Sequence, residues 1–283
     1  MAPATSAPDT GDFEVLRQLP GAGSATLSGE DEGDGTPLVL LHGLTATRRN
    51  VVQGSRGLVR QGYRQISYDA RGHGRSSPAP SYAYPDLIGD LGAVLADRGL
   101  ERAVLAGSSM GAATAMGFAL RHPERVPALV QITPAFAGAS ADESRWDRLA
   151  DALESGGIEA FVNANDPDTL PERWRESVRM AITQRMERHE HLDAVAAALR
   201  AVPRSLPWEG LEPLERLEVP TLVIGSRDEA DPLHPLAVAE AYARLLPDVE
   251  LVVEEEGQPP LAWQGGRLAR TIVQFLESRL SRG

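Results

Sequence analysis

A serine flanked by two glycines stands at the junction of an apolar run and a helical pattern. Residues 103–106 predict a buried strand, a helical pattern begins at Met110, and Gly107, Ser109 and Gly111 form a Gly-X-Ser-X-Gly motif between them. In such a tight turn, only small residues two positions before and after the serine avoid a backbone clash. The serine hydroxyl is then exposed beside the free N–H groups and the positive dipole end of the helix. The motif therefore predicts a nucleophile next to a place that stabilises an oxyanion.

The elements that must position this serine alternate between strands and helices. After a predicted edge hairpin around residues 20–23, the sequence predicts strands at 37–41, 63–68, 102–106, 128–132, 220–225 and 250–253. Helices are predicted at 49–61, 84–97, 110–121, 235–246 and 266–281. Unbroken apolar runs such as 37–41 are typical of parallel strands that are covered on both faces. The pattern predicts an α/β fold with a mostly parallel central sheet and helices on both faces.

The alternation of strands and helices stops between residues 133 and 219, where the sequence shows helical periodicity without a convincing strand. We expect helices at 144–155, 158–164, 171–188 and 191–201. The chain then divides into a flexible N-terminus (1–12), a core (13–132 and 220–283) and a helical cap insertion (133–219). An insertion of this size would cover whatever lies above Ser109. The alternative is that these helices simply enlarge the core.

Four motifs, in order along the chain, resemble those of a known superfamily. Residues 41–44 (Leu-His-Gly-Leu) are similar to its His-Gly loop, and residues 69–76 to its Asp-X-Arg-Gly-X-Gly-X-Ser turn. The Gly-X-Ser-X-Gly motif follows at 107–111, and residues 225–228 (Gly-Ser-Arg-Asp) are similar to its acid-bearing loop. From Phe13 to Leu280 the chain thus resembles the α/β-hydrolase superfamily.

The resemblance implies an α/β-hydrolase fold and a role for each matching residue. Ser109 would be the nucleophile, and the backbone N–H groups of Leu44 and Met110 would form the oxyanion hole. Asp228 would be the catalytic acid, because it stands three residues beyond the glycine of its loop. Asp231 is expected to cap the helix that follows instead.

The chain departs from the family pattern at the catalytic histidine. This residue is expected after the last strand, some thirty residues past the acid, and Gln258 stands there. A carboxamide cannot accept a proton near neutral pH, so Ser109 needs a base from elsewhere or triad chemistry does not occur. His234, six residues beyond Asp228, is the favoured substitute, although it could also be a surface residue that begins the next helix.

The other histidines are weaker candidates for the base. His42 and His73 are expected to hold loops together, and His122 is expected to be solvated at a helix end. His189 and His191 lie near a junction of the cap, from which a side chain could reach the pocket.

Composition narrows the classes of partner. The formal net charge of −12 and the absence of a basic run argue against binding to nucleic acid or anionic membranes. No signal-like start or 18-residue apolar run is present, so we expect a cytoplasmic protein without a membrane span. With no cysteine and no ligand-like histidine spacing, we expect no metal and no cofactor. We expect a small-molecule substrate and a monomer or homodimer.

Two functional hypotheses remain open. The first is a cofactor-free serine hydrolase that acts on an ester, thioester or related acyl bond of a small to medium, largely apolar substrate. The second is a catalytically altered protein of the same fold that lacks a complete triad and binds a small molecule or catalyses a non-hydrolytic step. The histidine missing from position 258 favours the second, whereas Ser109, Asp228 and the His-Gly loop favour the first.

Overall fold

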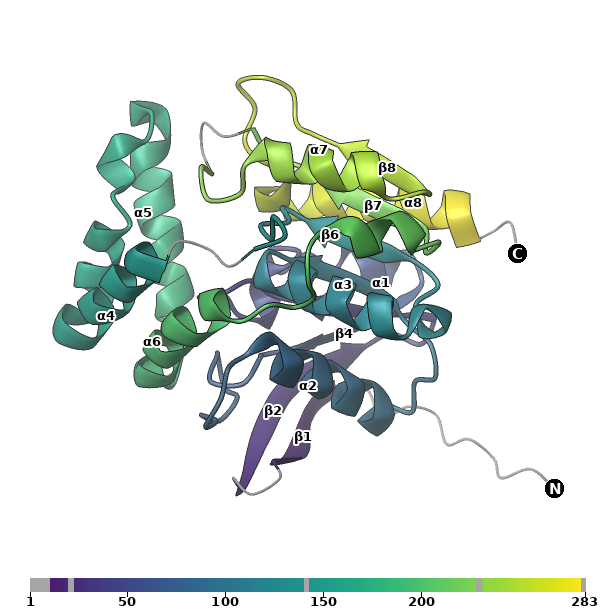
Figure 1. Ribbon diagram of the computed structural model, residues 1–283, viewed down its shortest axis with the longest axis horizontal. Coiled ribbons are helices and arrows are strands. Elements are labelled where there is room, and N and C mark those ends of the chain that lie inside the picture. The colour runs from purple at the N-terminus through teal and green to yellow at the C-terminus, as the bar shows by residue number, and fades with distance from the viewer. Residues whose placement is uncertain (1–10, 20–22, 140–142, 228–230, 281–283) are drawn as a thin grey trace.

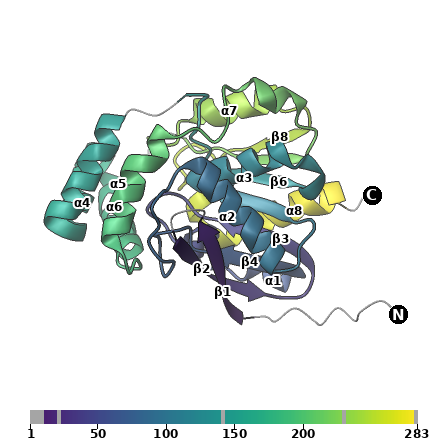
Figure 2. The same cartoon turned by 60° about the horizontal axis from the view of Figure 1, so that its bottom comes forward.

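The computed structural model describes residues 11–19, 23–139, 143–227 and 231–280, and its centre is one eight-stranded sheet (Figures 1 and 2). The strands are β1 (Gly11–Leu19), β2 (Gly23–Glu32), β3 (Thr36–Leu41), β4 (Tyr63–Tyr68), β5 (Val104–Ser108), β6 (Leu129–Ile132), β7 (Thr221–Ile224) and β8 (Val249–Val252). They lie in the order β1-β2-β4-β3-β5-β6-β7-β8. β1 and β2 form an antiparallel edge hairpin, β2 also pairs antiparallel with β4, and the pairs from β4 to β8 are parallel. The predicted fold class is confirmed.

Helices bury both faces of this sheet. They are α1 (Gly57–Arg60), α2 (Tyr84–Asp97), α3 (Met110–Arg121), α7 (Leu236–Leu245) and α8 (Gly265–Leu280). Apolar side chains of α2, α3 and α7 pack with Val39 and Leu105, whereas those of α1 and α8 pack with Leu38 and Val104. Neighbouring residues of one strand point to opposite faces, which explains why the central strands are apolar throughout.

The predicted helix at 49–61 is wrong. That segment contains a 3-10 turn at Arg48–Asn50 and the four-residue helix α1. Between them, Gln53 and Gly54 have φ angles of 50° and 68°, which a right-handed helix cannot contain. The Ser55 hydroxyl then accepts a hydrogen bond from the Gly57 N–H (3.1 Å). Helical periodicity alone could not reveal this interruption.

In the described part of the segment between β6 and β7, three α-helices stand at one end of the sheet (Figure 1). They are α4 (Glu143–Ala164), α5 (Glu172–Met186) and α6 (Leu192–Ala201). The predicted break between residues 155 and 158 is a kink inside α4, where Gly157 has φ 65°. The three helices share an apolar cluster of their own that includes Leu153, Phe161, Ile182 and Leu199. They form the cap, while its boundaries at 133 and 219 and the flexible residues 1–12 stay predictions.

His189 joins the cap to the loops that follow β3 and β4. Its Nδ1 accepts a hydrogen bond from the Gly74 N–H (2.8 Å), so Nε2 carries the proton and donates to the Thr45 carbonyl (3.1 Å). The next residue, Glu190, donates its N–H to the Gly74 carbonyl (2.9 Å). The end of α5 is thereby fastened beside the carboxyl ends of two central strands.

His189 belongs to a buried row of three histidine rings. The rings of His42 and His73 lie 5.2 Å apart, and those of His73 and His189 lie 5.6 Å apart. Their exposed fractions are 2%, 1% and 8% along the row. Burial lowers the pKa of all three, to about 4 for His42, and neighbouring histidines act in the same direction on His42 and His73. Asp69 opposes the lowered pKa of His73 and His189. The row is therefore neutral at pH 7.

Acid is expected to destabilise the protein through this row. Below about pH 6.5 the three histidines bind protons in the unfolded state but stay neutral in the folded state. The free energy of unfolding therefore falls as the pH is lowered. The loss is up to about 1.4 kcal/mol per pH unit for each such histidine, and it ends for His42 near its folded pKa of about 4. Above pH 6.5 both states are neutral and the row adds no pH dependence. Urea unfolding at pH 7.5, 6.5, 5.5 and 5.0 measures the slope.

A pair of variants isolates the contribution of the row. His73→Phe keeps a buried ring but removes one titrating group, so its stability should fall less steeply between pH 6.5 and 5. His122→Phe removes a histidine that is 47% exposed and should keep the parent slope. Equal slopes in the parent and in His73→Phe would contradict the prediction.

Candidate active site

Ser109 occupies a strained turn between β5 and α3. Its φ and ψ angles are 52° and −111°, outside the region that residues with a side chain prefer. A Cβ on Gly107 would overlap the carbonyl of Gly111, and a Cβ on Gly111 would overlap the carbonyl of Leu41. The Ser109 N–H donates to the Ile132 carbonyl on the neighbouring strand (3.0 Å). The backbone is that of the turn predicted from the motif, while the catalytic role of Ser109 stays a prediction.

The loop after β3 lies against this turn. A Cβ built on Gly43 would be 3.4 Å from the Cβ of Ser109, so the two backbones approach closely. Leu44 and Met110 pack in one apolar cluster. Among the described residues, neither the Leu44 N–H nor the Met110 N–H donates to a protein acceptor. Both N–H groups are thus available to a ligand, as a pair of oxyanion donors requires.

His42 fixes the shape of this loop and has no ring nitrogen left for catalysis. Its Nε2 accepts a hydrogen bond from the Ala70 N–H (2.8 Å), and its Nδ1–H donates to the Gly43 carbonyl (2.8 Å). Both nitrogens of His189 are used in the same way. The expectation that His42 holds loops together agrees with these contacts, and both residues are excluded as a ready base.

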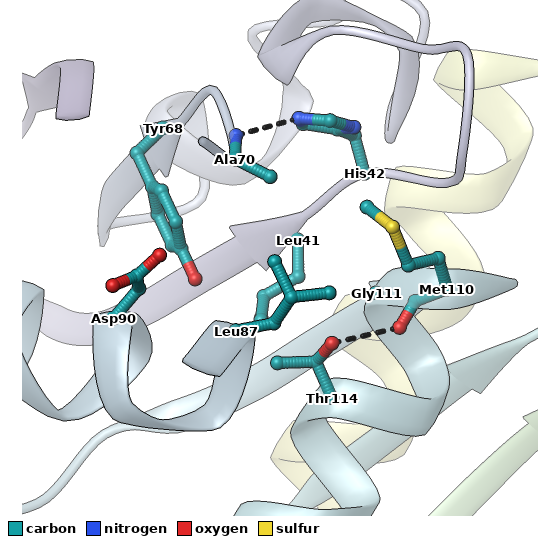
Figure 3. Close-up of a pocket in the computed structure, with 9 residues that line it drawn as sticks. All are labelled: Leu41, His42, Tyr68, Ala70, Leu87, Asp90, Met110, Gly111 and Thr114. Carbon is teal, nitrogen blue, oxygen red and sulfur yellow. Dashed lines mark hydrogen bonds between the residues drawn. The ribbon is translucent and has the colours of Figure 1, made fainter. Parts of the chain in front are cut away.

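Behind the loop, His42 and Met110 also line a small internal cavity (Figure 3). Its volume of about 10 Å³ is room for roughly one water molecule. The Thr114 hydroxyl donates to the Met110 carbonyl at its wall (2.9 Å), and the ring of Tyr68 lies beside Asp90 (Figure 3).

A wider open groove of about 410 Å³ lies between residues 78–83 and α6. Ser109 lines neither space.

His234 lies on the loop after β7, where it is paired with Asp231. The His234 Nδ1–H donates to Asp231 Oδ2 (2.8 Å), and both side chains are less than one-fifth exposed. Burial alone would raise the pKa of the Asp231 carboxyl, but His234, Arg185 and the Leu233 N–H hold that pKa below its usual value. The predicted acid, Asp228, lies outside the described residues.

The predicted capping role of Asp231 is wrong, because α7 begins at Leu236 with Pro235 at its N-cap. Asp231 instead accepts a hydrogen bond from the ring of His234. A carboxylate that binds Nδ1–H leaves the Nε2 lone pair of a histidine available to accept a proton.

Glu254, which the motifs did not single out, connects the loops after β7 and β8. Its Oε1 accepts hydrogen bonds from the Arg227 N–H (2.6 Å) and the Ser226 hydroxyl (3.2 Å), and its carbonyl accepts one from Arg227 Nε (3.0 Å). The side chain is 3% exposed, and Oε2 has no partner among the described residues. Of the three consecutive glutamates 254–256, Glu254 alone is buried.

Gln258 is exposed on the loop after β8. Its N–H donates to the Glu255 carbonyl (3.1 Å) in a turn where Gly257 has φ 78°. Within the described part of the chain, no hydrogen bond joins its side chain to Ser109 or His234. The assignment of position 258 to the family histidine stays a prediction.

The three remaining histidines differ in accessibility. His122 is exposed at the end of α3, with its ring 4.9 Å from that of Phe118. His191 is the N-cap residue of α6. The Nε2 of His73 is buried and has no hydrogen-bond partner among the described residues. Burial and a lowered pKa make His73 a poor proton carrier near neutral pH.

The described residues contain no group of three or more histidine, aspartate and glutamate side chains placed to hold a metal ion. None of their helices combines the length and apolar character needed to cross a bilayer.

Comparison with known proteins agrees with this architecture. The family model described as alpha/beta hydrolase fold matches residues 36–265. The non-heme chloroperoxidase CPO-A1 of Kitasatospora aureofaciens is 26% identical over 270 residues, which are 87% of this chain and 94% of that protein. The AB hydrolase superfamily protein YisY of Bacillus subtilis (strain 168) is 28% identical over 265 residues, 89% of this chain and 96% of that protein.

A solved structure shows the same fold. A thermophilic esterase from Thermogutta terrifontis, with malate bound, superposes with a TM-score of 0.78 and 26% identity. The match covers 94% of this chain and 98% of the esterase. These proteins are similar to the chain in fold but carry different activities, so they define a family and not a substrate. The chain belongs to the α/β-hydrolase fold family.

Proposed function

We propose that the protein is a cofactor-free serine hydrolase that cleaves an ester, thioester or related acyl bond of a small to medium, largely apolar substrate. The observation that carries this proposal is the strained turn of Ser109 beside the loop of Gly43 and Leu44. In such a turn the strained backbone makes the serine hydroxyl project from the chain. Strain of this kind is typical of functional sites.

In the proposed reaction the Ser109 hydroxyl attacks the acyl carbon and its proton passes to a base. The carbonyl electrons move to oxygen, and the N–H groups of Leu44 and Met110 stabilise that oxyanion. Collapse of the tetrahedral intermediate expels the alcohol or thiol, which takes the proton back from the base. Water then repeats the sequence on the acyl-enzyme, releasing the acid and restoring Ser109.

We propose His234 as that base, with Asp231 as the carboxylate that orients it. The hydrogen bond from His234 Nδ1–H to Asp231 fixes the tautomer whose Nε2 accepts a proton. The carboxylate also stabilises the imidazolium that forms during attack. Asp228 remains the acid that the sequence motif predicts, and the two aspartates can be compared directly by mutation.

Apolar side chains at the carboxyl end of the sheet support an apolar substrate. Leu233, next to His234, is 37% exposed, and Trp263, beyond the loop of Gln258, is 36% exposed. Trp263 also contacts Trp174 on the cap (6.1 Å between ring centroids). Partly exposed apolar groups beside polar ones are typical of sites for small organic ligands.

The second candidate is a protein of the same fold that binds a small molecule or catalyses a non-hydrolytic step without a complete triad. The observation that favours it is the exposed carboxamide of Gln258 at the family histidine position. The candidate predicts a Ser109 that is not activated, so the first experiment below separates the two.

Ser109→Ala is expected to abolish turnover of short p-nitrophenyl esters and labelling by a fluorophosphonate probe. The change removes the nucleophile but keeps the backbone turn, so the melting temperature should stay nearly the same. Labelling is read by intact-protein mass spectrometry. Parent protein that neither turns over esters nor reacts with the probe would support the second candidate.

His234→Ala is expected to lower kcat/KM by about 10²- to 10⁴-fold, because general-base help is lost. Asp231→Asn and Asp228→Asn, assayed side by side, identify the aspartate that supports the base. His191→Ala is the matched control, and an equal loss in this control would exclude His234 as the specific base.

Gln258→His is expected to restore activity in the His234→Ala background. Position 258 follows β8, where the family places its histidine, so an imidazole there could replace the lost base. The rescue should be a gain of about 10²-fold or more and should vanish when Ser109→Ala is added. If ester turnover shows no gain, the loop of Gln258 does not reach Ser109. A gain that survives the loss of Ser109 would mean that the chemistry is not serine-based.

A further inference from the structure

Helix α5 of the cap spans the carboxyl ends of the central strands. Near its start, Trp174 contacts Trp263, which follows β8 (6.1 Å between ring centroids). Just beyond its end, His189 hydrogen-bonds the carbonyl of Thr45, which follows β3. β5, which leads directly into Ser109, lies between β3 and β8 in the sheet. The helix therefore runs above the strand end that presents Ser109.

Arg185 lies on the same face of α5 as Trp174, because eleven residues make about three helical turns. Its guanidinium interacts electrostatically with Asp231 and with His189. Asp231 is in the loop of the proposed base, and His189 hydrogen-bonds the loop that follows β3. Burial lowers the pKa of Arg185, and Asp231 is the charge that acts in the opposite direction.

The guanidinium of Arg185 is not neutralised in the way that the buried arginines are. Each of the most buried arginines forms a short ion pair: Arg48 with Asp69 and Glu30, Arg64 with Asp31, and Arg71 with Asp90. For Arg185 no acidic oxygen lies within 4 Å among the described residues, and its Nε is buried without a hydrogen-bond partner. Asp231, the opposing charge that acts on Arg185, is already hydrogen-bonded to His234.

A partly buried cation with an unmatched donor lowers the stability of the folded protein unless an anion binds there. The guanidinium fork fits a carboxylate well, since its N–H groups can donate to both oxygens. Because the formal net charge of the protein is −12, a cation at the site would favour an anionic group of the substrate over a neutral one.

We propose that Arg185 binds a carboxylate of the substrate, which is an ester or thioester with a second, anionic end. This inference rests on the proposed function and adds a substrate class to it. The scissile carbonyl lies at Ser109, an apolar segment passes along the site, and the carboxylate meets Arg185 of the cap. A half-ester of a dicarboxylic acid has this pattern of groups.

The test compares charged and neutral substrates of matched length. Mono-p-nitrophenyl glutarate against p-nitrophenyl valerate places the carboxylate on the acyl side. The butanoate ester of 4-hydroxybenzoate against phenyl butanoate places it on the alcohol side. For the pair whose carboxylate reaches Arg185, Arg185→Gln should lower the charged-to-neutral ratio of kcat/KM by about 10- to 100-fold. Arg185→Lys should keep part of the parent ratio. For the other pair of substrates, the charged-to-neutral ratio should change little in either variant.

Arg145→Gln is the matched control. Arg145 is also a cap arginine whose Nε is buried without a partner, but its charged neighbours, Arg148 and Asp166, are both cap residues. The control should keep the parent ratio for both pairs. An unchanged ratio in Arg185→Gln for both pairs, or an equal fall in Arg145→Gln, would overturn the proposal.

A binding measurement separates failure of this inference from failure of the proposed function. Glutarate should bind to Ser109→Ala protein in calorimetry, and Arg185→Gln should weaken that binding at least tenfold. If no ester is turned over but glutarate binds through Arg185, the anion site stands and the hydrolase proposal fails. If esters are turned over but neither the ratio nor glutarate binding depends on Arg185, the hydrolase proposal stands and this inference fails.

Discussion

The backbone of Ser109 is the constraint on which the rest of the site depends. A non-glycine residue at φ 52° and ψ −111° persists only where its surroundings hold it, at a cost of about 1–3 kcal/mol. The N–H of Ser109 is held by Ile132 of β6, and Gly111 lies against the end of β3. Parallel strands on both sides of β5 therefore impose the turn. The same contacts place the first turn of α3 and the loop of Gly43 next to one hydroxyl.

The buried histidine row explains how this family member contains six histidines and still lacks an obvious base. In His42 and His189 both ring nitrogens form hydrogen bonds with backbone groups, so these residues are structural links and not proton carriers. Because a neutral imidazole both donates and accepts, it can satisfy two backbone groups of opposite polarity at once. His189 uses this property to fasten the cap without burying a charge. His73 keeps an unpartnered Nε2, but burial lowers its pKa, so the proposed base is His234, whose Nδ1–H donates to Asp231 and leaves Nε2 to accept a proton.

Local sequence predicted the central sheet well and the loops less well. Runs such as 37–41 and 63–68 specify strands because both of their faces must be buried, and the glycines around Ser109 specify the turn sterically. The helix expected at 49–61 failed because two residues of positive φ interrupt it, which periodicity does not show. Asp231 was misassigned and Glu254 was overlooked for a shared reason. Their partners, His234 in one case and the distant Arg227 in the other, are set by loop conformation and tertiary contacts.

Charge at the site is arranged across the interface between the core and the cap. The core loops contribute two carboxylates, Asp231 and Glu254, each of which accepts a hydrogen bond from a neighbouring loop residue. The cap contributes the guanidinium of Arg185, which interacts with Asp231 but has no ion pair of its own among the described residues. In the proposed reaction the oxyanion forms near the N-terminus of α3, whose dipole favours negative charge. The neutral imidazole of His189 brings the cap to this place, so the positive charge of Arg185 remains available to a bound anion.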